Sequence, residues 1–125
     1  MKIEKVTVED AAELLSIYAP YVRETAITFE YDAPTLEEFQ NRIINISSKY
    51  PYIKAVKNGE ILGFAYADAF RERKAYDWSV ETTIYVKQGR HKMGIGRALY
   101  SALEKSLRDM GILNMNARIA VPVKE

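Results

Sequence analysis

The amino-acid sequence predicts a mixed α+β domain in which helices flank a central, mostly antiparallel sheet. Segments with helical or strand periodicity follow one another in the order β-α-α-β-β-β-α-β. The pair Asn58 and Gly59 stands between two apolar runs, which is typical of a tight hairpin between antiparallel strands. The final strand, helix and strand favour one parallel crossover, because parallel neighbours need a connection long enough to hold a helix.

The first strand and helix are expected at the start of the chain. Residues 2–7 alternate apolar and charged side chains and indicate a strand. Thr7 and the two acids at 9–10 are typical of a helix start, because a hydroxyl caps free amides and negative charge suits that helix end. Pro20 lacks a backbone N–H, so this helix should end or kink near Ala19. Its apolar residues at helical spacing are Ala11, Leu14, Leu15, Tyr18 and Val22.

A second helix and a hairpin are expected next. Thr35 and Glu38 form a capping box, so the helix should begin between them. The apolar segments 50–56 and 60–70 flank the Asn-Gly turn and are expected to pair as the hairpin. The apolar stripe of the second helix consists of Leu36, Phe39, Ile43 and Ile46.

The last third predicts a strand, a helix and a final strand. Residues 79–86 are rich in β-branched side chains, and a period of two places Glu81, Thr83 and Tyr85 on one face. Gly111 should end the following helix, and residues 112–121 should form the last strand. The buried face of that helix is expected to be Ile95, Leu99, Leu103, Leu107 and Met110.

Composition limits the classes of function. The 125 residues suffice for one domain, residues 1–125, with one core. With 18 basic and 17 acidic residues the surface has no general field for nucleic acid, so no nucleic-acid partner is expected. The lack of cysteine excludes disulfides, thiolate catalysis and zinc–thiolate sites, and no metal is expected. A charged start and no long apolar run argue against a signal peptide or membrane span, which favours a cytoplasmic protein.

A basic, glycine-containing stretch joins the strand at 79–86 to the following helix. Arg90, His91 and Lys92 precede Gly94 and Gly96. Glycine lets the backbone approach a ligand closely, and the first amides of a helix point outward as anion donors. The stretch therefore predicts a phosphate-binding loop, although the same glycines could serve only a tight strand-to-helix turn. It is neither a Walker loop nor a three-glycine dinucleotide fingerprint.

The stretch resembles the acyl-CoA pyrophosphate loop of the GNAT superfamily of N-acetyltransferases, (Gln/Arg)-x-x-Gly-x-(Gly/Ala), with His91 where Gln or Arg is usual and Arg90 before it. The blocks "RETAITFEYDAPT", "AYDWSVETTIYV", "GIGRALYSALEKSL" and "LNMNARIAVP" resemble the phosphinothricin acetyltransferase subgroup. This resemblance implies the GNAT fold, acetyl-CoA as co-substrate, and N-acetylation of a small amino-acid-like amine of the phosphinothricin or methionine sulfoximine type. It also implies a homodimer.

The resemblance assigns roles around the fourth strand. A carboxylate in an apolar strand is costly unless it is useful or paired, and Glu81 matches the family's general base; its alternative role is an ion pair with Arg73. The backbone of Ile84, Tyr85 and Val86 would bind the pantetheine arm. An amide of this segment would also hold the thioester carbonyl. Tyr100 is expected to flank the core rather than contact the cofactor. The pyrophosphate would be held by Arg90, His91, Lys92, Met93, Gly94, Ile95, Gly96 and Arg97.

For the acceptor, the resemblance implies recognition of a carboxylate together with a phosphinate or sulfoximine. Arg71, Arg73 and Tyr76 match the subgroup's substrate positions, and Phe29 matches the aromatic of its N-terminal segment. Forked guanidinium groups suit such oxyanions. The run "RERK" could instead be a solvated connector. Trp78 is expected to be a core or interface anchor.

Other functions stay open. The family continues with a further helix and two strands, so a domain incomplete at the C-terminus is expected, with the strand at 112–121 as a bare edge that favours self-association. One alternative is therefore a catalytically weak acyl-CoA-binding or oligomerisation module. Another is an acetyltransferase for protein N-termini or polyamines, against which Arg73 and Tyr76 argue mildly, because a polycation calls for acids.

Overall fold

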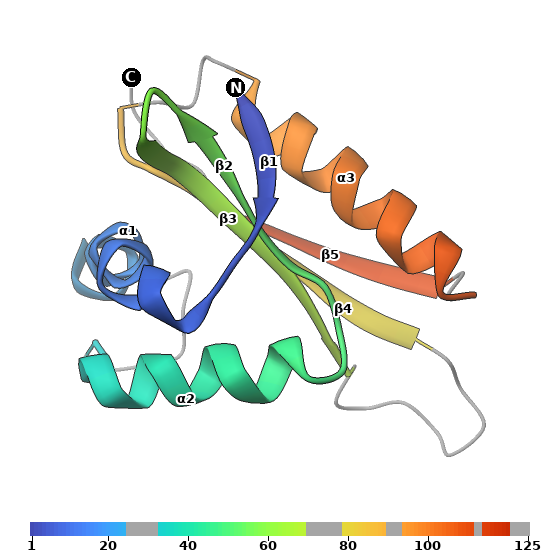
Figure 1. The fold of residues 1–125 in the computed structure, drawn as a ribbon, viewed down its shortest axis with the longest axis horizontal. Coiled ribbons are helices and arrows are strands. Elements are labelled where there is room, and N and C mark those ends of the chain that lie inside the picture. The colour runs from blue at the N-terminus through green and yellow to red at the C-terminus, as the bar shows by residue number, and fades with distance from the viewer. Residues whose placement is uncertain (25–32, 70–78, 90–93, 112–113, 121–125) are drawn as a thin grey trace.

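The computed structural model describes residues 1–24, 33–69, 79–89, 94–111 and 114–120. Its five-stranded sheet has the order β1-β2-β3-β4-β5, antiparallel except for the parallel pair β4 and β5, which confirms the expected α+β class. Helices α1 and α2 lie on one face of the sheet and α3 on the other (Figure 1). The elements are β1 (Lys2–Lys5), η1 (Val8–Asp10), α1 (Ala11–Glu24), α2 (Leu36–Ser47), β2 (Tyr52–Lys57), β3 (Glu60–Ala69), β4 (Ser79–Val86), α3 (Ile95–Asp109) and β5 (Asn114–Ala120).

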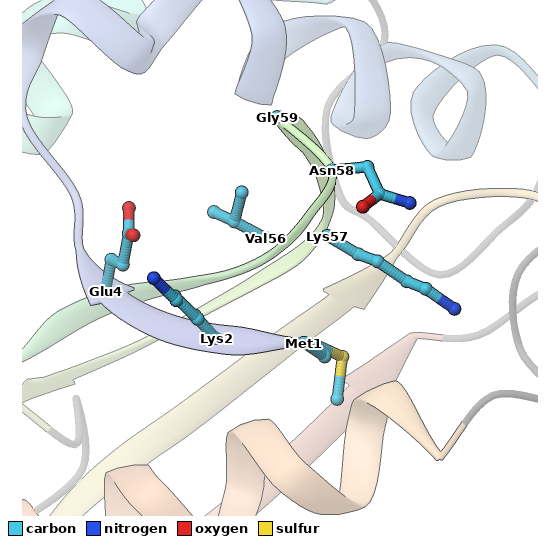
Figure 2. A pocket seen from close by; sticks show the side chains of 7 residues that line it. All are labelled: Met1, Lys2, Glu4, Val56, Lys57, Asn58 and Gly59. Atoms are coloured by element: carbon cyan, nitrogen blue, oxygen red, sulfur yellow. The ribbon is translucent and has the colours of Figure 1, made fainter.

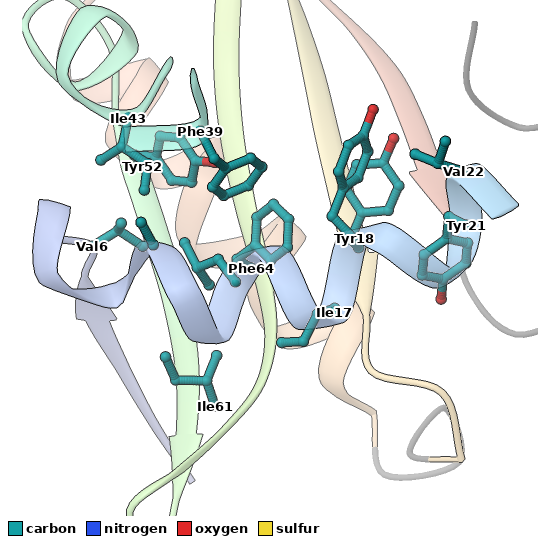
Figure 3. Close-up of a cluster of buried hydrophobic side chains, with 13 residues drawn as sticks. Val6, Ile17, Tyr18, Tyr21, Val22, Phe39, Ile43, Tyr52, Ile61 and Phe64 are labelled. Atoms are coloured by element: carbon teal, nitrogen blue, oxygen red, sulfur yellow. The ribbon is translucent and has the colours of Figure 1, made fainter. Parts of the chain in front are cut away.

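The sheet separates two hydrophobic clusters, because alternate side chains of a strand point to opposite faces. The cluster under α1 and α2 contains Tyr85 of β4 and is rich in aromatic rings (Figure 3). The cluster under α3 contains Ile84 and Val86 of the same strand. The predicted two-residue period of β4 is therefore confirmed, and Glu81 belongs to the α1–α2 side.

A close contact sets α3 against β3 at Gly63. A Cβ atom there would lie 2.9 Å from the backbone oxygen of Tyr85, 3.0 Å from Cγ2 of Ile95 and 3.2 Å from Cδ1 of Leu99. These spacings are shorter than side chains normally accept, so only glycine lets the start of α3 approach the sheet this closely. The beginning of α3, where the phosphate loop is expected, is thereby fixed relative to β4.

The β2–β3 hairpin forms as predicted. Asn58 and Gly59 both have left-handed φ angles, 53° and 79°, as the tight Asn-Gly turn requires. The register then shifts, because Ala55 pairs with Gly63 whereas Val56 pairs with Ile61. The extra residue makes a β-bulge.

The bulge is tied to α1 by a side chain. The Ile61 N–H donates to the Glu13 carboxylate at 2.9 Å, so a backbone group beside the irregular pairing is satisfied from the helix.

The predicted capping box of α2 is also present, with Thr35 and Glu38 exchanging bonds of 2.8 and 3.1 Å.

The structure differs from the sequence predictions at three points in the helices, of which the first concerns the expected end of the helix at Ala19 and not the alternative of a kink there. Helix α1 does not end near Ala19 but continues through Pro20 to Glu24, because Tyr21 and Val22 are buried and packing holds the last turn. Leu36 is 43% exposed, since it is the first residue of α2 and projects beyond the sheet-facing stripe. Met110 is 51% exposed, because α3 ends at Asp109 and the chain turns away into Gly111, whose φ is 85°.

Candidate active site

Strand β4 places Glu81 on the α1–α2 face of the sheet, where its side chain is partly buried. In the register, Glu81 pairs with Asp68 of β3 on one side and with Asn116 of β5 on the other. Directly opposed residues of antiparallel strands share a face, with Cβ atoms about 5 Å apart. Two carboxylates therefore stand together at this point. Asp68 has no signal in the sequence pattern, because its position opposite Glu81 depends on the β3–β4 register, which periodicity does not give.

Tyr66 lies beside this acidic pair. Its register partner is Thr83, whose side chain hydrogen-bonds the phenol. Burial raises the pKa of Tyr66, the carboxylates of Asp68 and Glu81 raise it further, and Thr83 and Arg42 of α2 act in the opposite direction. The phenol therefore stays neutral at neutral pH and offers a hydrogen-bonding group next to Glu81.

A small pocket adjoins Tyr66 on the same face. Its volume of about 20 Å³ is room for roughly one water molecule. Arg42 contributes a cation to walls that are otherwise mainly aromatic. This face of β4 thus combines acid, phenol and guanidinium groups with a layer of aromatic rings. The pocket is lined by Tyr18, Phe39, Arg42, Ile46, Tyr52, Phe64, Tyr66 and Tyr85.

The last residues of β4 face inward on both sides. The Tyr85 ring packs edge-on against Tyr18, with centroids 5.0 Å apart, while Ile84 and Val86 are buried under α3. Because these three side chains are fixed in the core, only their backbone groups are positioned to meet a cofactor. The sequence prediction for residues 84–86 concerned the backbone, and it stays a prediction.

The start of α3 has the features of an anion site. Gly94 precedes it with a φ of 70°, no side chain caps it, and its first turn contains no acid. The first helical bond runs from the Ala98 N–H to the Gly94 carbonyl at 3.1 Å, so the amides of residues 95–97 have no acceptor within the helix. Arg97 adds an exposed cation. These amides and the helix dipole favour a negatively charged group.

Gly96 bears on the choice between a ligand-binding loop and a tight turn. Among the described residues, a Cβ there would meet the Val86 side chain alone, at 3.7 Å, which is ordinary contact. Neither packing nor a left-handed backbone requires glycine at this position, and glycine in a helix is usually destabilising. Packing against the part of the chain that the structure describes therefore does not account for glycine at 96, and a bare backbone suits the close approach of a ligand.

Several predicted site residues lie outside the described residues: Phe29, Arg71, Arg73, Tyr76, Arg90, His91, Lys92 and Met93, and Trp78 as well. Tyr100 is partly buried against the α3-side cluster. In the described ranges, His, Asp and Glu side chains form no group of three suited to a metal ion. None of the helices in these ranges combines the length and apolar composition needed to cross a bilayer.

A larger surface hollow lies elsewhere. Its volume is about 570 Å³, and it adjoins the β2–β3 turn and the N-terminal strand (Figure 2). Gly59 borders it just before the first residue of β3, whereas Asp68 lies near the other end of that strand. The hollow is therefore separate from the Glu81 side of the sheet. Its walls are Met1, Lys2, Glu4, Val56, Lys57, Asn58 and Gly59.

Comparison with known families and structures identifies the class of this domain. The family model for the acetyltransferase (GNAT) domain matches residues 3–124, and the chain belongs to this family. The family prediction from the sequence is therefore confirmed.

Two curated relatives with the same name are similar to this chain over most of its length. The chain is 31% identical to phosphinothricin N-acetyltransferase of Streptomyces viridochromogenes, covering 98% of this chain and 67% of that protein. It is 38% identical to the protein of that name from Streptomyces coelicolor, covering 91% and 69%.

Solved structures agree in fold. A GNAT superfamily phosphinothricin acetyltransferase from Sinorhizobium meliloti, in complex with AcCoA, has a TM-score of 0.87 and 33% identity, covering 93% of this chain and 64% of that one. A ribosomal-protein-alanine N-acetyltransferase from Brucella melitensis has a TM-score of 0.88 and 26% identity, covering 94% and 73%. The predicted GNAT-like sheet flanked by helices is thus confirmed.

Proposed function

We propose that the chain transfers an acetyl group from acetyl-CoA to the amine of a small amino-acid-like substrate of the phosphinothricin or methionine sulfoximine type. Family membership, the names of the two Streptomyces relatives and the AcCoA complex of the Sinorhizobium meliloti protein support this. The observation that carries the proposal is the arrangement of β4. It presents the partly buried Glu81 near its beginning and leads, after Val86, to the glycine-led start of α3.

Each part of the site then has a role. Acetyl-CoA brings the acetyl group as a thioester; the amine nitrogen bonds to the acetyl carbon, the C–S bond breaks, and the thiolate of CoA leaves and takes up a proton. Glu81 accepts the proton of the attacking amine, directly or through a water molecule. The backbone of residues 84–86 hydrogen-bonds the pantetheine arm, and residues 90–97 hold the pyrophosphate at the positive end of α3. The acceptor's carboxylate and its phosphinate or sulfoximine group are held by Arg71, Arg73 and Tyr76, and Phe29 contacts the apolar part of the acceptor.

A second candidate is acetylation of a polyamine. It is favoured by Asp68, which stands directly opposite Glu81 and puts a second carboxylate beside the proposed base. Two acids suit an acceptor that carries a further ammonium group beyond the reacting amine. Asp68→Asn should then raise KM for a polyamine while leaving KM for a zwitterionic amino acid nearly unchanged.

The test of the proposed function is acetyl-CoA-dependent thiol release with a panel of amines. The panel contains phosphinothricin, methionine sulfoximine, spermidine and a peptide with a free N-terminus. Glu81→Gln keeps the shape of the side chain and removes the base, so turnover should fall by about 10²–10⁴-fold with acetyl-CoA binding unchanged. Glu9→Gln, an exposed acid near the N-terminus, is the matched control.

One result would contradict this function, and another would contradict the role of Glu81 within it. Acetyl-CoA binding without thiol release for any amine would identify a binding module. Unchanged turnover in Glu81→Gln would remove Glu81 from the chemistry.

We also propose that the protein works as a homodimer in the cytoplasm. The family resemblance supports self-association, and so does the place of β5 at the end of the sheet that the described residues form. The dimer is testable through that edge.

A further inference from the structure

One buried hydrogen bond joins α1 to the end of β4. The Tyr21 hydroxyl donates to the backbone carbonyl of Val86 at 2.5 Å, and both residues are fully buried. The Tyr21 ring also packs against Tyr85, with centroids 5.2 Å apart. Figure 3 shows Tyr21 projecting from α1 at one end of the aromatic cluster. The contact spans 65 positions of sequence, so it is a tertiary link between the helix and the strand that carries Glu81.

The register shows which way the Val86 carbonyl points. Val86 pairs with Gly63 of β3, and the next amide, of Lys87, donates to the Leu62 carbonyl at 2.8 Å. In an antiparallel pair this pattern flanks a non-hydrogen-bonded position, so the N–H and C=O of Val86 point away from β3. They point to the β5 side, where the described pairing of β4 runs as far as Tyr85 and Ala120.

We propose that Tyr21 is a positioning residue for acetyl-CoA, because its hydroxyl holds the Val86 carbonyl on the β5-facing side of β4 for the pantetheine arm. The inference rests on the proposed function, which sets that arm along residues 84–86. A carbonyl oxygen has two lone pairs, so it can accept from Tyr21 and from an amide of the arm together. Burial raises the pKa of Tyr21 to about 12, and the phenol therefore remains a donor under all ordinary assay conditions.

The experiment compares two ligands in the full chain by titration calorimetry. Acetyl-CoA has the pantetheine arm, and adenosine 3′,5′-bisphosphate lacks it. Tyr21→Phe keeps the ring and removes only the hydroxyl. Its affinity for acetyl-CoA should fall about 3- to 10-fold, as expected for one lost hydrogen bond, with no change for the bisphosphate.

Tyr52→Phe is the matched control. It removes a hydroxyl from another buried tyrosine of the same aromatic cluster, on β2, where the ring stacks on Phe64. Both variants should unfold cooperatively, and Tyr52→Phe should bind both ligands as the wild type does.

Two results would overturn the positioning role alone: an unchanged acetyl-CoA affinity in Tyr21→Phe, or an equal loss for both ligands. A wild-type chain that does not bind acetyl-CoA would instead overturn the proposed function, and this inference with it.

Discussion

At the scale of single residues, Asp10 connects the beginning of the fold to the sheet. Its carboxylate accepts from the Lys54 ammonium of β2 at 2.8 Å and from the Thr7 N–H at 2.9 Å. One side chain therefore caps the turn that precedes α1 and anchors it to β2. Partial burial alone would raise the pKa of Asp10, but the bonds and charge of Lys54 and the bonds of Thr7 outweigh it and lower the pKa below the usual 3.8.

This lowered pKa predicts a loss of stability in acid. The ionised carboxylate is favoured in the folded chain, so its contribution is complete above the unfolded pKa near 3.8 and is lost as pH falls through the lower folded value. The free energy of unfolding, measured by urea denaturation from about pH 6 down to pH 2.5, should decline below about pH 4.

Asp10→Asn should cost about 1 kcal/mol at neutral pH and flatten part of that decline. Glu9→Gln, the exposed neighbouring acid, should leave the profile unchanged. A decline of the same size in Asp10→Asn and in the wild type would show that Asp10 does not cause it.

At the scale of elements, local chemistry decided most of what the sequence could predict. The Asn-Gly turn, the capping box at Thr35 and the β-branched run of β4 need only neighbouring residues, and all three formed as predicted. The expected end of the helix at Pro20 was wrong, because the effect of a proline depends on burial of the following turn. Helix preference is weak beside such tertiary packing.

Candidate site residues divide in the same way. Glu81 follows from alternation along one strand, and Gly94 and Gly96 follow from a local motif. Asp68 and Tyr21 have roles that depend on partners 13 and 65 positions away, through the β3–β4 register and the packing of α1. A sequence pattern contains no signal for such pairings.

The packing of α3 on the sheet gives a paired prediction at two glycines. Gly63→Ala places a methyl group against the Tyr85 backbone oxygen and the Ile95 side chain, so it should destabilise the fold by about 1–3 kcal/mol. Gly96→Ala has room for its methyl group and should leave stability equal or higher by up to about 1 kcal/mol.

Acetyl-CoA titration separates the two glycines further. If the bare backbone at 96 serves the pyrophosphate, Gly96→Ala should bind acetyl-CoA at least about 10-fold more weakly despite its stability. Ser101→Ala, on the exposed face of α3, is the control for helix propensity. Full affinity in Gly96→Ala would assign that glycine to the turn alone.

At the scale of the whole molecule, the two faces of the sheet differ in the kind of side chain that they carry. Aromatic rings, the acidic pair and Tyr66 occupy the α1–α2 face, while aliphatic side chains hold α3 on the other. From Glu81 to Val86 the strand spans about 17 Å, five residues at roughly 3.3 Å each. This one strand therefore sets the distance between Glu81, the proposed proton acceptor, and Val86, at the end of the segment proposed to bind the cofactor.

Strand β5 is the last strand of the described sheet and pairs in parallel with β4. An edge strand presents unpaired backbone groups that recruit another strand. We expect a homodimer through this edge. Light scattering at low micromolar concentration should give about twice the chain mass of 14.3 kDa.

Proline substitutions at two adjacent positions of β5 locate the contact. Successive backbone N–H groups of a strand point to opposite sides, so one of Asn116→Pro and Ala117→Pro removes a bond to β4 and the other removes an outward donor. The first kind of change should lower the unfolding temperature. The second should yield a folded monomer, because proline on a free edge blocks pairing without disturbing the sheet behind it. If the wild type is already a stable, active monomer, or if both variants keep the dimer mass, the edge of β5 is not the interface.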